Sequence, residues 1–488
     1  MNCETGSNQA ASKSRGRRRC PLAQRSAQGF SPLLLLGASL WFALAPPACA
    51  ADALVWRADR NAVDARLENW PLSRVLQSIS TATGWEVYVE PNAERPVSVK
   101  FKGLDPAAAL RRLLEGLNFA LVPETNRAPR LFVYRTSVGD ATELVPGLKA
   151  KSAKPTSRVI PNELLVTLKP GAKESIADLA RRLGAKITGS IDGLNTYRLQ
   201  FDDAAAAQTA RDTLSQDPSV ASVENNISLG QPELPAPVSL SSASAPLPKL
   251  NAKAGAAGVV IGLVDTAIQP KGTGLDGFLL PTVSVAGQSD PPNNQPTHGT
   301  AMAETMLQSL SLNDAATGAT SVRILPVDVY GGNPTTSTFD VANGIYSAVQ
   351  GGATLINLSL GGTTDSPLLH QVIQSATQQG ALFFAAAGND PTTTPTYPAA
   401  YPEVISVTAG NQSGLAPYAN RGDFVDVVAP GTSIINFNNT DYMVTGTSTS
   451  TADVTGLAAA LSDQTGKSPA QVRAQILSQL SIAPYRKP

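Results

Sequence analysis

The chain has 488 residues, 42% of them hydrophobic and 16% charged, and a formal net charge of zero. This length suggests roughly three domains of about 150 residues each, and the composition is typical of a globular protein rather than a disordered one. The net charge of zero is the sum of a positive charge on residues 1–50 and a negative charge on the remainder. Residues 1–50 hold six basic residues and one acidic residue, whereas the remainder holds 32 basic and 37 acidic residues. Since no basic patch follows residue 50, no nucleic-acid partner is expected.

The basic start precedes an apolar run at residues 31–45, and small residues follow at Ala48 and Ala50. The run is too short for a comfortable membrane span, and the small-x-small pattern is typical of a signal peptidase site. Residues 1–50 are therefore predicted to be a secretory signal peptide, with an uncleaved membrane anchor as the alternative. No later stretch is long and apolar enough to cross a bilayer, so no transmembrane span is expected after signal removal.

All three cysteines, Cys3, Cys20 and Cys49, lie before the predicted cleavage point. A chain processed after Ala50 has no thiol. This excludes disulfides, a cysteine-based zinc site and a cysteine nucleophile in the processed protein.

Residues 51–140 have the pattern of a small α+β domain. Apolar residues at helical spacing predict a helix that opens at Asn69-Trp70-Pro71-Leu72 and closes at Gly84, and a second helix from Asp105 to Gly116. The predicted strands are Trp85–Val89, Val97–Phe101, Phe119–Val122 and Leu131–Tyr134. The region has no His, no Cys and no tight carboxylate cluster, so it is interpreted as binding or structural.

Two stretches of this region, PLSRVLQSISTATGWEVYVEP and LDPAAALRRLLEGLNFAL, resemble the short N-terminal domain shared by secretins and TonB-dependent receptors. The resemblance implies a Gram-negative envelope setting and a protein or cell-wall partner bound through residues 51–140.

Residues 154–230 form a second predicted α+β unit. Its elements are a strand at Leu164–Leu168, a helical face from Ile176 to Gly184, a strand at Tyr197–Leu199, a helix at Ala205–Leu214 and an edge strand at Val220–Val223. Residues 231–250 follow with five prolines and a Ser/Ala cluster, and are predicted to be an extended, exposed linker that is easily nicked by proteases.

From residue 251 to 488 apolar runs alternate with helical patterns. The predicted strands are Val259–Val264, Ile324–Val329, Thr354–Leu360, Ala381–Ala387, Val404–Val407 and Val425–Val428, and the predicted helices include Ala301–Leu310, Phe339–Gln350 and Leu368–Gln379. Near-continuous apolar strands are typical of a buried parallel sheet. The pattern predicts an α/β fold with a doubly wound, mostly parallel sheet, whose site lies at the carboxyl ends of the strands.

Four polar residues stand at such places. Asp265 ends the first strand, His298 lies in the small-residue turn before a helix, and Asn389 follows a buried strand. Ser448 begins a helix after Gly446, where backbone N–H groups could bind an oxyanion and Thr447 or Ser448 could cap the helix. A helix cap is the alternative for Asp265, and a Ser/Thr-rich capping loop is the alternative for Ser448.

The chain has two histidines, so a Ser-His mechanism has two candidate bases. His370 lies mid-helix, without glycine or acidic neighbours in the sequence, and is assigned a solvated or packing role. His298 is the candidate base. The order Asp265, His298, Ser448 is that of subtilisin rather than of chymotrypsin or the α/β-hydrolases.

The segments GLVDTAI, HGTAMAE, INLSLGG, AAAGND, YPAAYPEVISVTA, VAPGTSI and TGTSTS then resemble, in family order, the subtilisin-like (subtilase, S8-type) serine proteases. The resemblance implies Ser448 as nucleophile, His298 as general base and acid, Asp265 as its orienting carboxylate and Asn389 with the Ser448 N–H as oxyanion donors. It further implies a substrate-binding edge at Ser359, Leu360, Gly361, Gly362 and Ala387. Residues 154–230 resemble the inhibitory propeptide of these proteases; a ferredoxin-like binding domain is the alternative.

Some positions depart from the family. Ala267 stands where Gly is usual, and Ala452-Asp453 stands where Pro-His is usual. No cofactor is required by this chemistry; a structural calcium remains open, without a recognisable calcium loop. The expectation is an exported zymogen, in the periplasm, at the outer membrane or secreted, that cleaves proteins or peptides and processes itself. A pseudoprotease that binds an envelope partner, and an esterase, are the rival functions.

Overall fold

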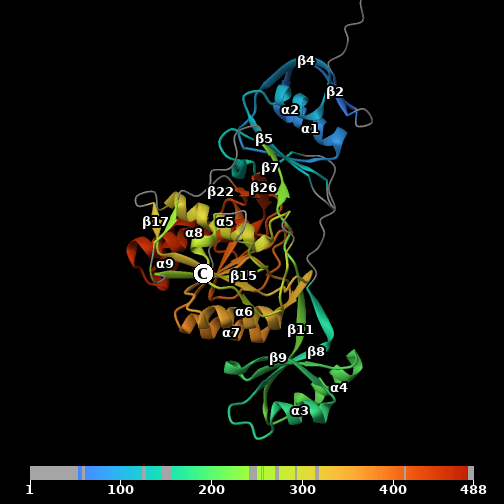
Figure 1. The fold of residues 1–488 in the computed structure, drawn as a ribbon. Coiled ribbons are helices and arrows are strands. Elements are labelled where there is room, and N and C mark those ends of the chain that lie inside the picture. Colours follow the sequence, from blue (N-terminus) through green and yellow to red (C-terminus); the bar gives the residue numbers. More distant parts are fainter. Residues whose placement is uncertain are drawn as a thin grey trace, which may run out of the picture. The chain divides into compact units, whose positions relative to one another are not determined.

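A computed structural model of the chain describes residues 53–57, 61–123, 128–145, 157–240, 250–253, 255, 258–269, 274–291, 294–313, 318–411 and 414–481 (Figure 1). The predicted signal peptide, residues 1–50, lies outside the described residues. The chain after residue 50 forms one compact unit by its contacts. We describe it as an N-terminal part (residues 53–145), a middle part (157–230) and a C-terminal part (250–481).

The two predicted helices of the N-terminal part are present. Helix α1 (Leu72–Thr83) follows Pro71 and ends at Gly84, whose φ of 74° suits a residue without a side chain. Helix α2 (Pro106–Leu113) begins after Asp105, whose carboxylate accepts the N–H groups of Ala107 and Ala108. It ends before Gly116, the predicted stop.

The strands of the N-terminal part form two sheets. One has the order β1-β2-β4, and the other contains β5, β6, β3 and β7. Asn69 and Trp70 lie in β2 rather than opening a helix, so that detail of the prediction was wrong. The bounds are β1 (Ala53–Arg57), β2 (Ala62–Pro71), β3 (Glu86–Val89), β4 (Pro96–Leu104), β5 (Asn118–Val122), β6 (Arg130–Tyr134) and β7 (Glu143–Leu144), with a 3₁₀ turn η2 (Val138–Asp140).

The middle part is a sheet with two helices. Its strands are β8 (Arg158–Leu168), β9 (Lys186–Ile191), β10 (Thr196–Gln200) and β11 (Val220–Gly230), and its helices are α3 (Ile176–Leu183), α4 (Ala204–Leu214) and the short η3 (Asp192–Leu194). Among the described residues the predicted edge strand, Val220–Val223, pairs on one side only, with β8, but the observed strand continues to Gly230. Strand β11 pairs on one side with β8 and on the other with β19 (Thr335–Ser337) of the C-terminal part.

The C-terminal part contains the predicted parallel sheet. Its order is β16-β18-β15-β20-β21-β22-β23, with β24 beside β22, and every pairing except that of β23 is parallel. The bounds are β15 (Val259–Asp265), β16 (Val283–Ser284), β18 (Val322–Asp328), β20 (Leu355–Leu358), β21 (Leu382–Ala386), β22 (Val404–Asn411), β23 (Gly414–Leu415) and β24 (Val427–Ala429).

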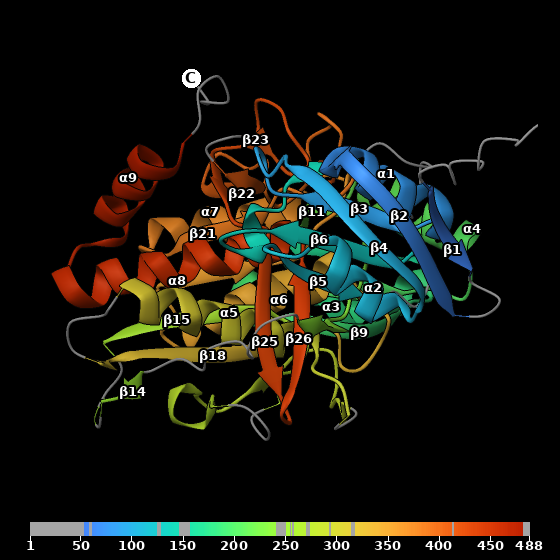
Figure 2. The same cartoon turned by 90° about the horizontal axis from the view of Figure 1, so that it is seen from above.

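Helices cover both faces of this sheet (Figures 1 and 2). Helices α5 (His298–Asn313), α8 (Thr447–Thr465) and α9 (Pro469–Leu480) pack against one face, through one apolar cluster that also contains Ile261, Leu263 and Ile324. Helices α6 (Thr338–Gln350) and α7 (Pro367–Gln378) pack against the other face. The sheet is therefore doubly wound, and of the described helices that cover it, α9 is the one that the sequence patterns did not indicate.

The predicted linker is extended, but its described residues are paired rather than free. Strand β12 (Ala236–Pro237) pairs with β26 (Thr440–Thr445), the second strand of a hairpin with β25 (Thr432–Phe437). Strand β13 (Ser239–Leu240) pairs with β5 of the N-terminal part. The remaining elements are β14 (Asn251–Ala252), β17 (Ala319–Thr320) and the 3₁₀ turn η4 (Asp276–Phe278).

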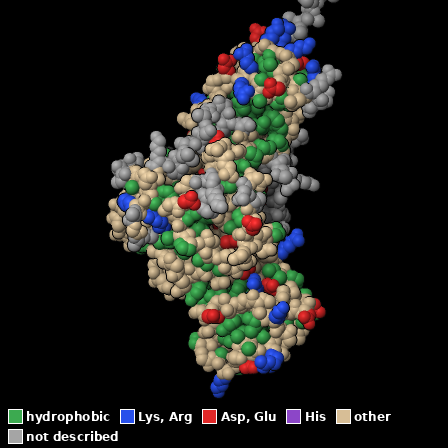
Figure 3. All heavy atoms as spheres, in the orientation of Figure 1, with side chains coloured by type: hydrophobic (Ala, Val, Ile, Leu, Met, Phe, Trp, Pro, Cys, Tyr) green, Lys and Arg blue, Asp and Glu red, His purple; other side chains and the backbone are tan. Residues whose placement is uncertain are grey.

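The surface shown in Figure 3 intersperses basic and acidic side chains, without a field of one sign. Within the part of the chain that the structure describes, none of the helices combines the length and the apolar character that a bilayer span requires.

The crossing of α5 and α8 gives a first prediction. A Cβ atom added at Gly456 of α8 would lie 2.4 Å from the Met306 carbonyl oxygen and 2.9 Å from Ser309 Cβ on α5. Gly456→Ala gains about 1 kcal/mol of helix propensity, but we expect the clash to lower the free energy of unfolding by about 1–3 kcal/mol net. Urea unfolding of the Ser448→Ala protein with and without the change measures it. Gly277→Ala, with 3.5 Å of room to Ala252 Cβ, is the control. Equal stability of both variants would contradict the prediction.

Candidate active site

Asp265 and His298 form a buried pair. Strand β15 ends at Asp265 and helix α5 begins at His298, and the imidazole Nδ1 lies 2.8 and 2.9 Å from the two carboxylate oxygens. The side chains are 0% and 2% exposed. Since a carboxylate accepts, Nδ1 carries a proton, and Nε2 is left to accept one. The backbone N–H of Thr266 donates to the same carboxylate at 2.7 Å, which fixes its orientation.

The turn before His298 is locked to the end of β15. The Thr297 hydroxyl donates to the Ala267 carbonyl at 2.6 Å, and the Gly299 N–H donates to the Thr266 hydroxyl at 2.8 Å. A Cβ atom at Gly299 would lie 2.2 Å from the Thr266 carbonyl oxygen. Glycine is therefore required beside the histidine, because the two backbones approach too closely for a side chain.

Ser448 lies in the first turn of α8 and is 8% exposed. Its hydroxyl donates to the Ser359 carbonyl at 3.2 Å, and the Ser359 hydroxyl donates to the Ser448 carbonyl at 3.1 Å. Among the described residues no hydrogen bond joins Ser448 to His298. The β15–β20 register, with Leu263 opposite Asn357, brings Asp265 and Ser359 to the same carboxyl edge of the sheet. Serine–histidine bonds are often loose before substrate binds.

Asn389 is oriented by Thr447. The Asn389 Oδ1 accepts from the Thr447 N–H at 2.8 Å and from its hydroxyl at 3.0 Å, while the Gly388 N–H donates to that hydroxyl at 3.0 Å. The amide oxygen is thus engaged, and the amide NH₂ remains as a donor beside Gly446. Helix α8 is capped by Gly446 with no side-chain cap bond, so the expected capping by Thr447 or Ser448 was wrong. Thr447 instead positions the amide.

The other predicted substrate-edge residues are fixed by internal bonds. Gly362 exchanges two backbone bonds with Tyr397, of 2.9 and 2.7 Å, and a Cβ atom at Gly361 would lie 2.7 Å from the Tyr397 carbonyl oxygen. Leu360 and Ala387 are buried, and the Ala387 carbonyl accepts from two side chains. Strand β11 of the middle part pairs with β19. Among the described residues, no strand of the middle part pairs with residues 359–362.

The end of the middle part lies along β19. Ser228, Leu229 and Gly230 are opposite Ser337, Thr336 and Thr335, and the Leu229 side chain would lie 2.8 Å from a Cβ atom at Gly362. The Gln231 N–H then donates to the Pro334 carbonyl at 2.9 Å, and the Pro235 carbonyl accepts from Gln295 at 3.0 Å. This segment therefore runs from β19 to the turn before His298. The sequence patterns did not indicate β19 as part of the site.

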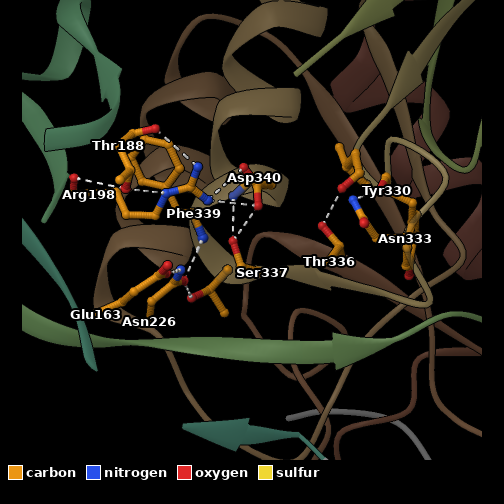
Figure 4. Close-up of polar contacts among 12 residues, drawn as sticks. Glu163, Thr188, Arg198, Asn226, Tyr330, Asn333, Thr336, Ser337, Phe339 and Asp340 are labelled. Atoms are coloured by element: carbon orange, nitrogen blue, oxygen red, sulfur yellow. Dashed lines mark hydrogen bonds and ion pairs between the residues drawn. The ribbon is translucent and has the colours of Figure 1, made fainter. Parts of the chain in front are cut away.

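Polar side chains of the middle part bind the start of helix α6 (Figure 4). The Asn226 amide oxygen accepts from the Thr338 hydroxyl and the Phe339 N–H, at 3.1 and 3.2 Å. The Arg198 guanidinium lies 3.1 Å from the Asp340 carboxylate and over the Phe339 ring. Burial raises the pKa of Asp340, against the lowering effect of Arg198.

Helix α7 is bound in the same way. The Glu224 carboxylate accepts from the Leu368 N–H at 3.1 Å and from the Ser366 hydroxyl at 3.2 Å. Burial raises the pKa of Glu224 to about 7. The N-caps of α6 and α7 are Ser337 and Ser366, and β11 of the middle part supplies a further acceptor to the first turn of each helix.

His370 lies apart from these contacts. Its Nε2 is 3.0 Å from a Glu403 carboxylate oxygen, and its ring stacks on Tyr401 with centroids 4.2 Å apart. The packing role agrees with the expectation. The acidic partner, Glu403, comes from a distant stretch of sequence, so the sequence neighbours of His370 did not indicate it. The described residues contain no cluster of three or more His, Cys, Asp or Glu that could hold a metal ion.

In comparison with known proteins, the chain matches two family models. Residues 256–483 match the subtilase family, and residues 145–226 match the fervidolysin N-terminal prodomain. The chain is 34% identical to thermitase of Thermoactinomyces vulgaris over 224 residues, which cover 45% of this chain and 80% of thermitase. It is 30% identical to subtilisin E of Bacillus subtilis (strain 168) over 317 residues, covering 63% of this chain and 80% of that protein. The chain belongs to the subtilase family.

This subtilase is a serine peptidase by family. A 34% identical match to the thermophilic serine proteinase of Bacillus sp. (strain AK1) covers 46% of the chain but only 56% of that relative. Among solved structures, fervidolysin of Fervidobacterium pennivorans shares the fold at a TM-score of 0.50 and 19% identity, covering 67% of this chain and 57% of that one. The middle part corresponds to a prodomain, in agreement with the resemblance of residues 154–230 to a propeptide.

Thr447 gives the second prediction. Thr447→Val removes the hydroxyl that holds both Gly388 and the Asn389 amide oxygen, so we expect kcat to fall about ten- to a hundredfold with little change in KM. Steady-state kinetics on a peptide substrate measures this. Thr449→Val is the matched control, because the buried Thr449 hydroxyl has no hydrogen-bond partner among the described residues. A loss of activity shared equally by both variants would contradict the assignment.

Glu304, on the helix that begins with His298, gives the third prediction. Burial raises its pKa from 4.5 to about 7, and its carboxylate accepts the Asn436 N–H at 3.2 Å. The folded state therefore binds more protons between these values, and the free energy of unfolding falls as pH rises from about 4.5 to about 7.

Glu304→Gln removes this proton uptake. The variant should lose less stability between pH 5 and pH 8, by at most about 3 kcal/mol. Urea unfolding at both pH values, in the Ser448→Ala background, measures the difference. Glu68→Gln, an exposed position, should leave the pH dependence unchanged. An equal loss of stability in the Glu304→Gln protein and its parent would overturn the prediction.

Proposed function

We propose that this subtilase is an exported serine endopeptidase, made as a zymogen, which uses Asp265, His298 and Ser448 as its triad. The observation that carries the proposal is the buried Asp265–His298 pair at the carboxyl edge of the sheet, where Ser448 in the first turn of α8 is hydrogen-bonded to Ser359. A fully buried carboxylate that holds an imidazole by both oxygens is the arrangement that general-base catalysis needs.

In this mechanism the Ser448 hydroxyl attacks the scissile carbonyl carbon, and His298 Nε2 takes the hydroxyl proton. Asp265 keeps Nδ1 protonated and stabilises the imidazolium that forms. The Asn389 amide and the Ser448 N–H, at the positive end of α8, donate to the developing oxyanion. His298 then gives its proton to the leaving amine, and water releases the acyl group by the same route. The reaction requires no metal or cofactor.

The contacts of β11 support a zymogen. The end of β11 pairs with the edge of β19, and residues 231–235 continue from there toward the turn before His298. A substrate peptide that paired with β19 would compete with the same backbone positions. We place the self-processing cut in this stretch, inside the linker of residues 231–250 that the sequence predicts to be easily nicked. Asn226 and Glu224 accept hydrogen bonds from the first turns of α6 and α7. These contacts support a second role of the prodomain, in helping the catalytic part (the C-terminal part, residues 250–481) to fold.

Export is supported by the sequence of residues 1–50, and protein or peptide substrates by the family. The resemblance of residues 51–140 to the secretin and TonB-receptor domain supports a Gram-negative envelope location and an envelope partner for that region. Periplasmic, outer-membrane-associated and secreted forms all agree with these features.

The fourth prediction tests the triad. After periplasmic expression, intact mass should show the wild type split within residues 231–235, while Ser448→Ala stays whole. Asn389→Ala should reduce turnover on a peptide substrate by about 10²–10³, the scale known for the oxyanion asparagine of subtilisin. Ester and peptide substrates, assayed side by side, separate a protease from an esterase. A folded wild type that neither splits nor cleaves either substrate would favour the pseudoprotease.

A further inference from the structure

Residues 236–240, here called the strap, join two sheet edges that belong to different parts of the protein. In β12, Ala236 is opposite Met443 and Pro237 is opposite Tyr442, and the Val238 N–H donates to the Asp441 carbonyl at 3.0 Å. In β13, Ser239 and Leu240 are opposite Leu121 and Ala120 of β5. The strap therefore completes the sheet of the N-terminal part with a strand from the chain that leads into the catalytic part.

An apolar cluster surrounds the strap and contains residues of all three segments. The N-terminal part contributes Tyr88 and Phe132, whose rings stack with centroids 5.1 Å apart. The cluster also contains Tyr134, Val138 and Ala141 of the same part, Ala236 and Val238 of the strap, and Ile434, Met443 and Tyr418 of the catalytic part. Met443 is buried. Separation of the two parts would expose this apolar surface to water, which opposes it.

A second contact lies beside the nucleophile. A Cβ atom at Gly139, in η2, would be 3.6 Å from Pro430 Cβ and 3.7 Å from the Thr432 carbonyl oxygen. The same turn holds the start of α8, because the Gly446 N–H donates to the Gly431 carbonyl at 2.8 Å and the Ser450 hydroxyl donates to the Pro430 carbonyl at 3.1 Å. The N-terminal part thus rests on the turn that holds both sides of Ser448.

We propose that the N-terminal part remains bound to the mature catalytic part after processing, as a docked domain held by the strap and by the 430–432 turn. The partner of this surface is a segment of the same chain, residues 53–145. A cut within residues 231–235 lies before the strap, so the strap stays on the catalytic fragment and continues to pair with β5 and β26. The timing of that cut rests on the proposed function, but the docking contacts do not.

The fifth prediction tests docking without relying on catalysis. In the Ser448→Ala protein, a recognition sequence for a site-specific protease is inserted between Val145 and Ser157, and the chain is cut there. Size-exclusion chromatography with intact mass should then find the N-terminal fragment eluting together with the fragment that begins after the cut. Because this protein cannot cut itself, the result is independent of whether the subtilase is active. Separate elution of the two folded fragments would overturn the proposal.

Two variants locate the contact. Gly139→Arg places a long side chain against Pro430 and Thr432, at a glycine whose backbone is not left-handed, so we expect affinity between the fragments to fall by about tenfold or more. Gln77→Arg adds the same charge at an exposed position of α1 and should leave affinity unchanged. Thermal unfolding of the uncut proteins checks that both variants fold. Equal affinities for the two folded variants would overturn the proposed surface.

Discussion

Burial of the Asp265 carboxylate constrains much of the catalytic part. A charge removed from water must find donors, and here the imidazole Nδ1–H and the Thr266 N–H supply them. The imidazole reaches the end of β15 because the backbone at Gly299 lies directly against the Thr266 carbonyl. Only glycine at position 299 allows so close an approach. The sequence His298-Gly299 thus follows from the need to satisfy one buried carboxylate.

The same logic extends to the opposite face of the sheet, where the helices α6 and α7 begin. Their first N–H groups require acceptors, and two of these come from strand β11 of the prodomain rather than from the catalytic part itself. Release of the prodomain would leave the Phe339 and Leu368 N–H groups to water, while the N-cap serines Ser337 and Ser366 would stay in place. Of the two acceptors on β11, only Glu224 can carry a charge, and burial raises its pKa to about 7. In the proposed zymogen, inhibition and folding assistance would therefore share strand β11 but use different hydrogen bonds of it, the pairing of residues 228–230 with β19 and the contacts of Asn226 and Glu224.

Sequence patterns predicted the parallel sheet and most of its helices, because buried strands are continuous apolar runs and helix starts carry recognisable glycines and caps. They also singled out Asp265, His298, Asn389 and Ser448, whose roles remain proposals. They missed contacts between segments far apart in sequence: Thr447 with Asn389, β19 with β11, and His370 with Glu403. Strand β2 has a recognisable sequence pattern, because Val63, Ala65 and Leu67 alternate with polar residues, and only its last three residues overlap the predicted helix start.

The linker shows most clearly why composition alone misleads. Prolines and small residues predict an extended chain, and residues 231–240 are extended. Composition, however, cannot tell whether the free backbone groups of such a chain face water or another sheet edge. Here β26 and β5 both present edges, and an extended segment that reaches them satisfies those edges as well as its own N–H and C=O groups. If the linker is cut within residues 231–235, as proposed, residues 236–240 would still join two parts of the protein.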